Sequence, residues 1–387
     1  MPAYRRRTWW GVAVAAIVVA ACKDSNGPQP QLSNPQQLAS DLQTVSSVFT
    51  SPTLQSFGAL RTATGSPIGA APATGALLGA APVVPPRMAN QPYADAAARL
   101  QAMRLAASAF SPTSPASVIP PTLLGKTFVW DPNTHQYVAD PTATPPAPSN
   151  GVRIILYQVD ASGQIIENPL TPVGYVDLLD QSDVSTNKLE VIVNGGTPAN
   201  ITANYADYTV SGTVTRNASN VVTAFSASAV GFVSDGAGGH RLDFNASFSV
   251  TNLDTDNPDA QLDVTWSLNN PAVSLALHET IATPDADHAT LTIDFSVTRG
   301  SETVRLAGTV TAVVSSQTVT YDLTVYVNGQ VYARITGTYP NIQIRHADGT
   351  PLSQDELAAL EGLFQVPADA TNVIEDLFHP AEHLMGG

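Results

Sequence analysis

Cysteine is nearly absent from this sequence: Cys22 is the only one in 387 residues. A chain with one thiol cannot form an internal disulfide, so no disulfide framework stabilises this protein. In an exported protein a single unpaired thiol also risks forming disulfides between molecules. If the chain is exported, we therefore expect the thiol of Cys22 to be chemically modified.

Basic residues are scarce as well. The 17 Lys and Arg residues stand against 32 Asp and Glu, which gives a formal net charge of −15. This balance argues against a nucleic-acid partner and against direct electrostatic docking on anionic lipid. We expect the acidity to serve solubility.

Charged and aromatic residues are few, at 13% and 7% of the chain, while Thr, Ser, Asn and Ala are abundant. A typical globular protein has about 25% charged residues. The composition suits an exported β protein with hydroxylated outer strand faces. An outer-membrane β-barrel also has strands of alternating apolar and polar residues, as this sequence does. Such a barrel carries two girdles of aromatic residues, however, and the aromatic residues here are too few to form them.

Catalytic motifs are missing. No Gly-x-Ser-x-Gly nucleophile motif occurs. The glycine-rich run Gly236–Gly239 lies between expected strands and not ahead of a helix, so it does not support a phosphate site. We therefore expect neither an enzyme nor a bound cofactor.

The N-terminus has the order of a bacterial export signal. Arg5 to Arg7 form a positive segment, and Trp9 to Ala21 form an apolar core. This core is shorter than the roughly 20 residues of a permanent membrane helix. Residues 1–21 are thus expected to be a cleaved signal peptide; a simple membrane helix is the alternative. The pair Arg6-Arg7 leaves a twin-arginine export route open beside the general one.

The signal ends in Val19-Ala20-Ala21-Cys22, which resembles the lipobox of bacterial lipoproteins. The resemblance covers residues 1–22 only. It implies cleavage before Cys22 and a diacylglycerol on its sulfur, which would also remove the hazard of a free thiol. An ordinary secretory signal that happens to contain a cysteine is the alternative.

Residues 22–33 are expected to be a flexible tether, because they are short, polar and rich in Asn, Gly and Pro. Multiple acyl chains, palmitate among them, would hold the protein at a membrane of the cell envelope, since one chain alone binds only marginally. In well-studied lipoproteins a residue other than Asp after the cysteine favours the outer membrane over the inner one. Lys23 occupies that place here.

The mature chain divides into three further regions. Residues 34–120 are expected to be helical and of low complexity, with a helix from Asn34 to about Phe49, an Ala/Gly/Pro-rich segment over 62–90 and a second helix over 94–110. In the first helix Leu38, Leu42, Val45 and Val48 have helical spacing, and Asp41 is expected on the opposite side.

Residues 121–349 are expected to be an antiparallel β domain. It opens with a hairpin around the turn Asp131 to Thr134. Apolar residues then fall at every second position, as in Leu242 to Val250 and Leu262 to Leu268, with polar residues between them. This period indicates sheets with one solvated face, and turns such as Asn328-Gly329 indicate consecutive hairpins. We expect a meander of about ten to twelve strands.

Residues 350–387 are expected to form two short helices, the first beginning near Ser353 and the second spanning about 369–378. A sheet of this size cannot stay flat. The predicted fold is therefore mainly β: a large curled, half-barrel-like antiparallel meander with N- and C-terminal helices packed on its apolar face.

This architecture resembles the half-barrel of periplasmic lipoprotein carriers and related lipid-binding lipoproteins, which implies an apolar groove for acyl chains. No motif carries the likeness, so it is a fold-level analogy. We expect a structural or protein-binding lipoprotein of the envelope. The alternatives are an apolar-ligand carrier and a surface protein that binds metal or carbohydrate.

Two clusters are weak candidates for metal sites. Asp254, Asp256 and Asp259 space carboxylates as a calcium loop does, but the EF-hand glycine and glutamate are missing. His278 and His288 would face each other across a hairpin if its turn centred near Thr283, and such a pair could bind zinc or copper. Solvated polar residues at turns are the commoner explanation of both clusters.

The sequence contains two further patterns. His379-Pro380-Ala381-Glu382-His383 resembles the inverted zinc-peptidase motif, but Pro380 interrupts the helix and no acidic ligand follows. Six aromatic residues could line a carbohydrate platform, although single aromatics on strands usually pack in the core: Trp130, Tyr137, Tyr157, Tyr175, Tyr205 and Tyr208.

Overall fold

The computed structural model describes residues 30–60, 63–64, 118–183, 186–255, 257–285, 287–313, 315–316, 318–360 and 363. Several expectations lie outside these residues. They are the signal peptide with Cys22, nearly all of the Ala/Gly/Pro-rich segment, the helix over 94–110, the second C-terminal helix and the His379–His383 motif.

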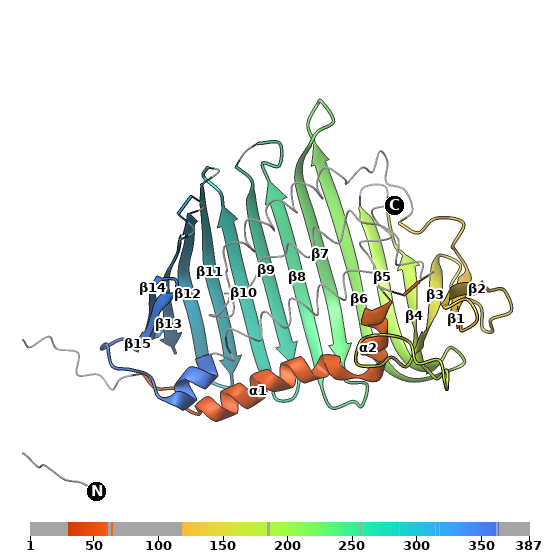
Figure 1. Cartoon of the computed structure of the whole chain (residues 1–387), viewed down its shortest axis with the longest axis horizontal. Coiled ribbons are helices and arrows are strands. Elements are labelled where there is room, and N and C mark those ends of the chain that lie inside the picture. Colours follow the sequence, from red (N-terminus) through yellow and green to blue (C-terminus); the bar gives the residue numbers. More distant parts are fainter. Residues whose placement is uncertain are drawn as a thin grey trace, which may run out of the picture.

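The described chain forms one open sheet of fifteen strands, in which nearly every strand lies beside its neighbour in sequence (Figure 1). Only β1 and β3 pair in parallel. The predicted meander is confirmed, with more strands than expected. The strands are β1 (Lys126–Asp131), β2 (Gln136–Asp140), β3 (Gly151–Tyr157), β4 (Pro172–Asp180), β5 (Asn187–Thr197), β6 (Asn200–Arg216), β7 (Val222–Ser234), β8 (Arg241–Thr251), β9 (Asp259–Leu268), β10 (Val273–Ala282), β11 (His288–Arg299), β12 (Glu302–Val313), β13 (Thr318–Val327), β14 (Gln330–Thr338) and β15 (Asn341–His346).

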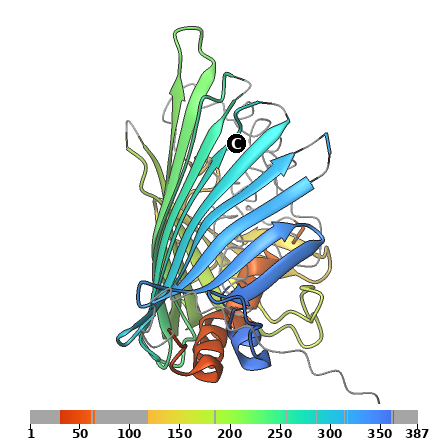
Figure 2. The ribbon, with the colours of Figure 1, turned by 90° about the vertical axis from the view of Figure 1, so that its left-hand side faces the viewer.

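Alternation along the strands separates the two faces of the sheet. On β8, Phe244 and Phe248 are buried, while Asp243 and Asn245 are exposed on the other face. Burying each such aliphatic or aromatic side chain contributes about 1.5–3 kcal/mol, so a one-residue slip in register would be costly. The sheet curls strongly, with the described helices on its apolar side (Figure 2).

The N-terminal helices form as their sequences predict. In α1 (Pro35–Ser47) the side chain of Asn34 accepts a hydrogen bond from the backbone N–H of Gln37 at 3.0 Å, and Pro35 occupies the first turn. After η1 (Val48–Thr50), helix α2 (Pro52–Ala59) is capped by Ser51, which accepts from the N–H of Leu54 at 3.2 Å.

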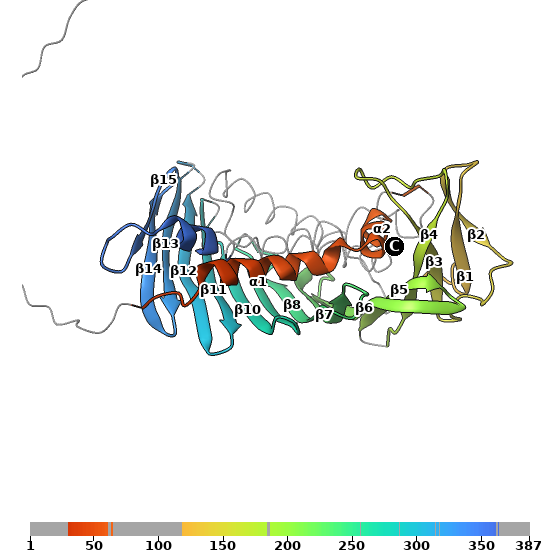
Figure 3. The ribbon, with the colours of Figure 1, turned by 90° about the horizontal axis from the view of Figure 1, so that it is seen from below.

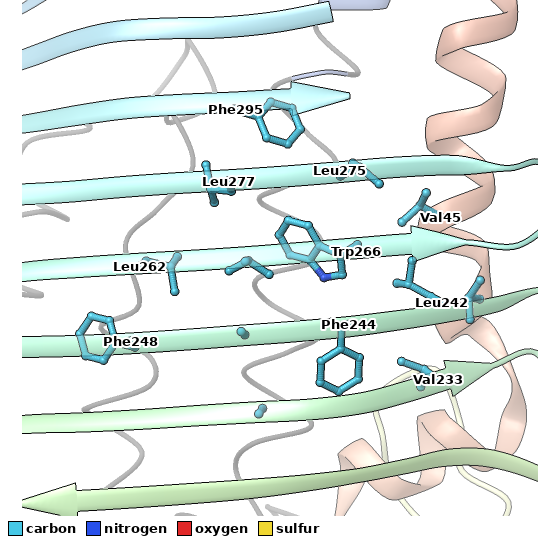
Figure 4. Close-up of a cluster of buried hydrophobic side chains, with 14 of the residues drawn as sticks. Val45, Val233, Leu242, Phe244, Phe248, Leu262, Trp266, Leu275, Leu277 and Phe295 are labelled. Atoms are coloured by element: carbon cyan, nitrogen blue, oxygen red, sulfur yellow. The ribbon is translucent and has the colours of Figure 1, made fainter. Parts of the chain in front are cut away.

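Helix α1 lies across the ends of the central strands (Figure 3). Its predicted apolar residues Leu38, Leu42 and Val45 are all buried. Figure 4 shows Val45 near Leu275 and Leu242 of the sheet. The helix therefore closes one end of the apolar face.

One expectation for α1 was wrong. Asp41 does not face solvent: it is 4% exposed and its carboxylate lies 3.2 Å from Nη1 of Arg299 on β11. The spacing of apolar residues within a helix could not predict this ion pair, because Arg299 is distant from Asp41 in the sequence.

The predicted C-terminal helix begins as expected, with residues 354–360 helical. Ser353 and Glu356 form a capping box: the N–H of Ser353 donates to Glu356 at 2.7 Å, and the N–H of Glu356 donates to the Ser353 hydroxyl at 3.3 Å. Leu360 and Leu363 are buried in the same core as the sheet. Among the described residues, no helix has the length and apolarity to span a membrane.

Candidate functional site on the polar face

Two adjoining hollows of about 490 and 400 Å³ open on the polar face of the sheet, across β8 to β12. Four residues line both hollows and form their common floor: Asn245, Thr265, Ala276 and Ser296. We call this continuous depression the polar groove.

The strand register explains why a groove forms there. Asn245 lies opposite Thr265, Thr265 opposite Ala276, Ala276 opposite Ser296, and Ser296 opposite Arg305. The Cβ atoms of residues that face each other on neighbouring strands lie about 5 Å apart, so their side chains form one row on the same face of the sheet. Small side chains at the middle of the row leave it lower than the residues around it.

The next row along the strands forms one wall. It contains Asp263, His278 and Asp294, which are consecutive in the register of β9, β10 and β11. Nδ1 of His278 lies 2.6 Å from a carboxylate oxygen of Asp263. Burial would raise the pKa of Asp263, but hydrogen bonds from Gln261 and His278 outweigh it and lower that pKa.

Arg305 closes the groove at the β12 side. Its Nε and Nη2 donate to the two carboxylate oxygens of Asp294 at 2.6 and 2.7 Å. The hydrogen bond from Arg305 is the main reason that the pKa of Asp294 is lowered, and the charge of His278 adds to it. The guanidinium also lies over the ring of Tyr326, 5.4 Å from its centroid. Asp294 is therefore ionised and Arg305 is held in place.

A similar trio stands at the β8 side. Arg241 donates to Asp243 at 2.6 and 3.0 Å, and its guanidinium stacks on Phe232, 3.6 Å from the ring centroid. Asp243 lines the groove and lies opposite Phe232 of β7. Each end of the groove is thus marked by an Arg that is paired with an Asp and stacked on an aromatic ring.

The predicted pairing of the two histidines is wrong. The turn between β10 and β11 centres three residues later than expected, so His278 lies opposite Asp294, and His288 lies opposite Val313 of β12. Nδ1 of His288 contacts Asp285 at 2.8 Å, and this hydrogen bond is the main reason that the pKa of His288 is raised. The two imidazoles belong to different parts of the polar face.

Of the candidate calcium residues, Asp254 lies in the loop between β8 and β9, and Asp259 is the first residue of β9. Asp254 accepts a hydrogen bond from Asn217 at 3.3 Å, and Asp259 accepts one from Asn252 at 3.0 Å. Asp256 lies outside the described residues. In the described part of the chain, no three His, Cys, Asp or Glu side chains are grouped closely enough to hold a metal ion.

The six aromatic residues do not make a platform. Four of them are buried, which agrees with the expectation that single aromatic residues on strands pack in the core: Tyr137, Tyr157, Tyr175 and Tyr208. Trp130 packs edge-on against Tyr137. The rings that flank the groove, Phe232 and Tyr326, were missed by the sequence reasoning. The strand alternation could have found Tyr326, because it follows Thr320, Asp322 and Thr324 on the polar side of β13.

Sequence reasoning also missed two buried charged groups. Arg153 on β3 makes a two-pronged ion pair with Asp177 on β4, at 2.7 and 2.8 Å. Its Nη1 also reaches the carbonyls of Pro145 and Pro146 at 3.3 Å. Glu279 of β10 is fully buried on the apolar face. Glu279 breaks the apolar alternation that predicted the strands, whereas Arg153 keeps it, because it alternates with the buried Val152 and Ile154.

No protein-family model matches this chain, and comparisons with curated proteins and with solved structures found no match either. These comparisons therefore suggest no ligand for the polar groove. Its chemistry has to be judged from the side chains that line it.

Proposed function

We propose that this chain is a lipid-anchored lipoprotein of the bacterial cell envelope, on the outer membrane, and that it serves as a structural or protein-binding component. The signal sequence and the Val19–Cys22 ending support the anchor. The acidic composition supports a covalent anchor, since a chain with a formal net charge of −15 is not attracted to anionic lipid.

The observation that carries the binding role is the open edge of the sheet at β15. Among the described residues, this strand pairs with β14 on one side, and only its last part is bridged on the other, through Arg345 and Pro351. An edge strand presents backbone donors and acceptors to which an extended segment of a partner can add. Ile342 and Ile344 are partly buried on one face and would set the register of the added strand.

The anchor has a direct test. Cys22→Ala should abolish labelling by radioactive or clickable palmitate and should release the protein from the membrane fraction. The signal peptide would still export the chain, so the variant should appear in the soluble periplasmic fraction. Equal membrane association of the variant and the native chain would refute the anchor.

The protein-binding role is tested by native mass spectrometry of the chain extracted from its own membranes. We expect a co-purifying protein that is lost in Ile344→Lys, because a charge on an edge strand opposes strand addition. Thr320→Lys, on the inner strand β13, is the matched control and should retain the partner. A partner kept by both variants would remove β15 as the interface.

A second candidate function is transport or binding of an apolar ligand. One observation favours it: Trp266 on the apolar face is 3% exposed, and its indole N–H has no hydrogen-bond partner among the described residues (Figure 4). A buried unpaired donor costs about 1–3 kcal/mol, which an acceptor on a bound lipid would offset. Co-purification of lipid in place of protein, lost in Trp266→Phe, would favour this role.

A further inference from the structure

We infer that the polar groove is a binding site for a neutral oligosaccharide. This inference goes beyond the proposed protein-binding role and is independent of the lipid anchor. It depends on three properties of the groove: its balance of charge, its supply of hydrogen-bonding groups and the shape of its floor.

Each carboxylate in the groove is hydrogen-bonded to a basic side chain. Asp294 is paired with Arg305 and Asp243 with Arg241, while Asp263 is hydrogen-bonded to His278, whose imidazole carries a charge only when it is protonated. With two of the three carboxylates neutralised by arginines, the lining residues offer no group of free carboxylates to a metal ion and no free guanidinium to a phosphate. The balance therefore favours a ligand without net charge.

The same residues supply directional hydrogen bonds. A carboxylate has about four acceptor positions, and Arg has five N–H donors. Arg305 uses two of these donors on Asp294, and each Asp294 oxygen accepts one of them, so both groups keep capacity toward the groove. Asn245, Thr265 and Ser296 add an amide and two hydroxyls on the floor. Vicinal sugar hydroxyls, which both donate and accept, fit this mixture.

The groove is elongated along the direction that crosses the strands. From β8 to β12 there are four spacings between strands, which amount to roughly 19 Å. Small side chains, Ala276 and Ser296, form the middle of the floor, Arg305 lines the groove on β12, and Asp243, which is paired with Arg241, lines it on β8. This form accommodates a short linear oligosaccharide better than a single small molecule.

A protein partner fits the groove less well. Protein interfaces centre on apolar and aromatic side chains, which carry most of the binding energy. The large apolar side chains exposed in the described chain are Ile201, Val221, Val230 and Leu357, and none of them lines either hollow. The four floor side chains of the groove are small, and three of them are polar.

The test uses the mature chain and three neutral probes, chitotetraose, cellotetraose and maltotetraose, with binding measured by calorimetry and by saturation-transfer NMR at millimolar sugar. We expect at least one probe to bind. Ala276→Trp, which fills the floor from an exposed position, should weaken that binding at least about tenfold, equivalent to about 1.4 kcal/mol. Asp294→Asn, which removes an acceptor and releases Arg305, should also weaken it.

Thr320→Trp is the matched control, because it places the same ring on the polar face of β13 outside both hollows. It should bind sugar as the native chain does. Equal unfolding midpoints of the two Trp variants would show that any loss is local. The acidic probe tetragalacturonate should not bind.

Three outcomes would overturn the inference. They are failure of all three neutral sugars to bind, binding that Ala276→Trp leaves unchanged, and tighter binding of tetragalacturonate than of any neutral probe. A photo-crosslinking residue at position 276 that captures a protein, in a chain that binds no sugar, would assign the groove to a protein interface instead.

Discussion

At the scale of single residues, several charged side chains of the described chain are placed in pairs. Arg153 and Asp177 illustrate this, because both are below 10% exposed and each satisfies the other. Burial alone would lower the pKa of Arg153, but its hydrogen bonds with Asp177 outweigh burial and raise it. Removing one partner of such a pair leaves an uncompensated buried charge, which is far costlier than the pair itself.

The capping residue Glu356 gives a prediction for acid stability. Burial would raise its pKa, but hydrogen bonds from Tyr332 and from Ser353 lower it to about 2 from the ordinary value of 4.5. Because the folded-state pKa is depressed, the stabilisation is present above pH 4.5 and is lost as the pH falls toward 2. We expect Glu356→Gln to reduce the free energy of unfolding by about 2 kcal/mol at neutral pH.

The measurement is urea unfolding of both proteins from neutral pH down to about pH 2. The difference between native chain and Glu356→Gln should shrink steadily below pH 4.5. Asp355→Asn removes a charge from the same helix start without touching the capping box, and it should cost less. A difference that does not depend on pH would show that Glu356 does not act through its charge.

At the scale of elements, α1 is attached to the sheet by apolar packing and by one ion pair. Arg299 contacts Asp41 at 3.2 Å and Glu302 at 3.8 Å, and Gln37 donates to Asp41 at 2.7 Å. The helix itself follows from its cap and its apolar spacing. The ion pair could not be predicted, because nothing local in the sequence relates Asp41 to a residue on β11.

Asp41→Ala should therefore loosen α1 while leaving the sheet intact. We expect a loss of about 2 kcal/mol in unfolding free energy, since Asp41 is buried and Arg299 keeps some contact with water. Hydrogen exchange should speed up in α1 and not in the central strands. The exposed pair of Arg241 and Asp243 is the comparison: Asp243→Ala should cost less than about 1 kcal/mol. Equal costs would contradict the special role of Asp41.

At the scale of the whole molecule, the chain enters the fold at the edge along which α1 lies. The N–H of Ser33 donates to Glu302 at 2.7 Å, beside the turn between β11 and β12. Ten residues lie between Cys22 and Ser33, so the chain between these two residues spans at most about 40 Å. The long hairpin of β6 and β7 points to the opposite side (Figure 1).

If Cys22 carries the anchor, the edge with α1 faces the membrane. A dye attached at Ser301→Cys should then transfer energy efficiently to an acceptor in lipid vesicles, whereas one at Ser219→Cys, in the loop between β6 and β7, should transfer much less. Lipidation of the only native thiol leaves each introduced cysteine as the sole labelling site. Equal transfer from the two positions would exclude this orientation.

The sequence by itself determined the alternation of the strands, the meander order, the caps at Asn34 and Ser353 and the apolar stripes of the helices. These features depend on residues close together in the chain. The tertiary structure alone decided the polar groove, the partner of Asp41 and the separation of His278 from His288. They depend on the register across neighbouring strands, where a turn displaced by three residues changes which side chains meet.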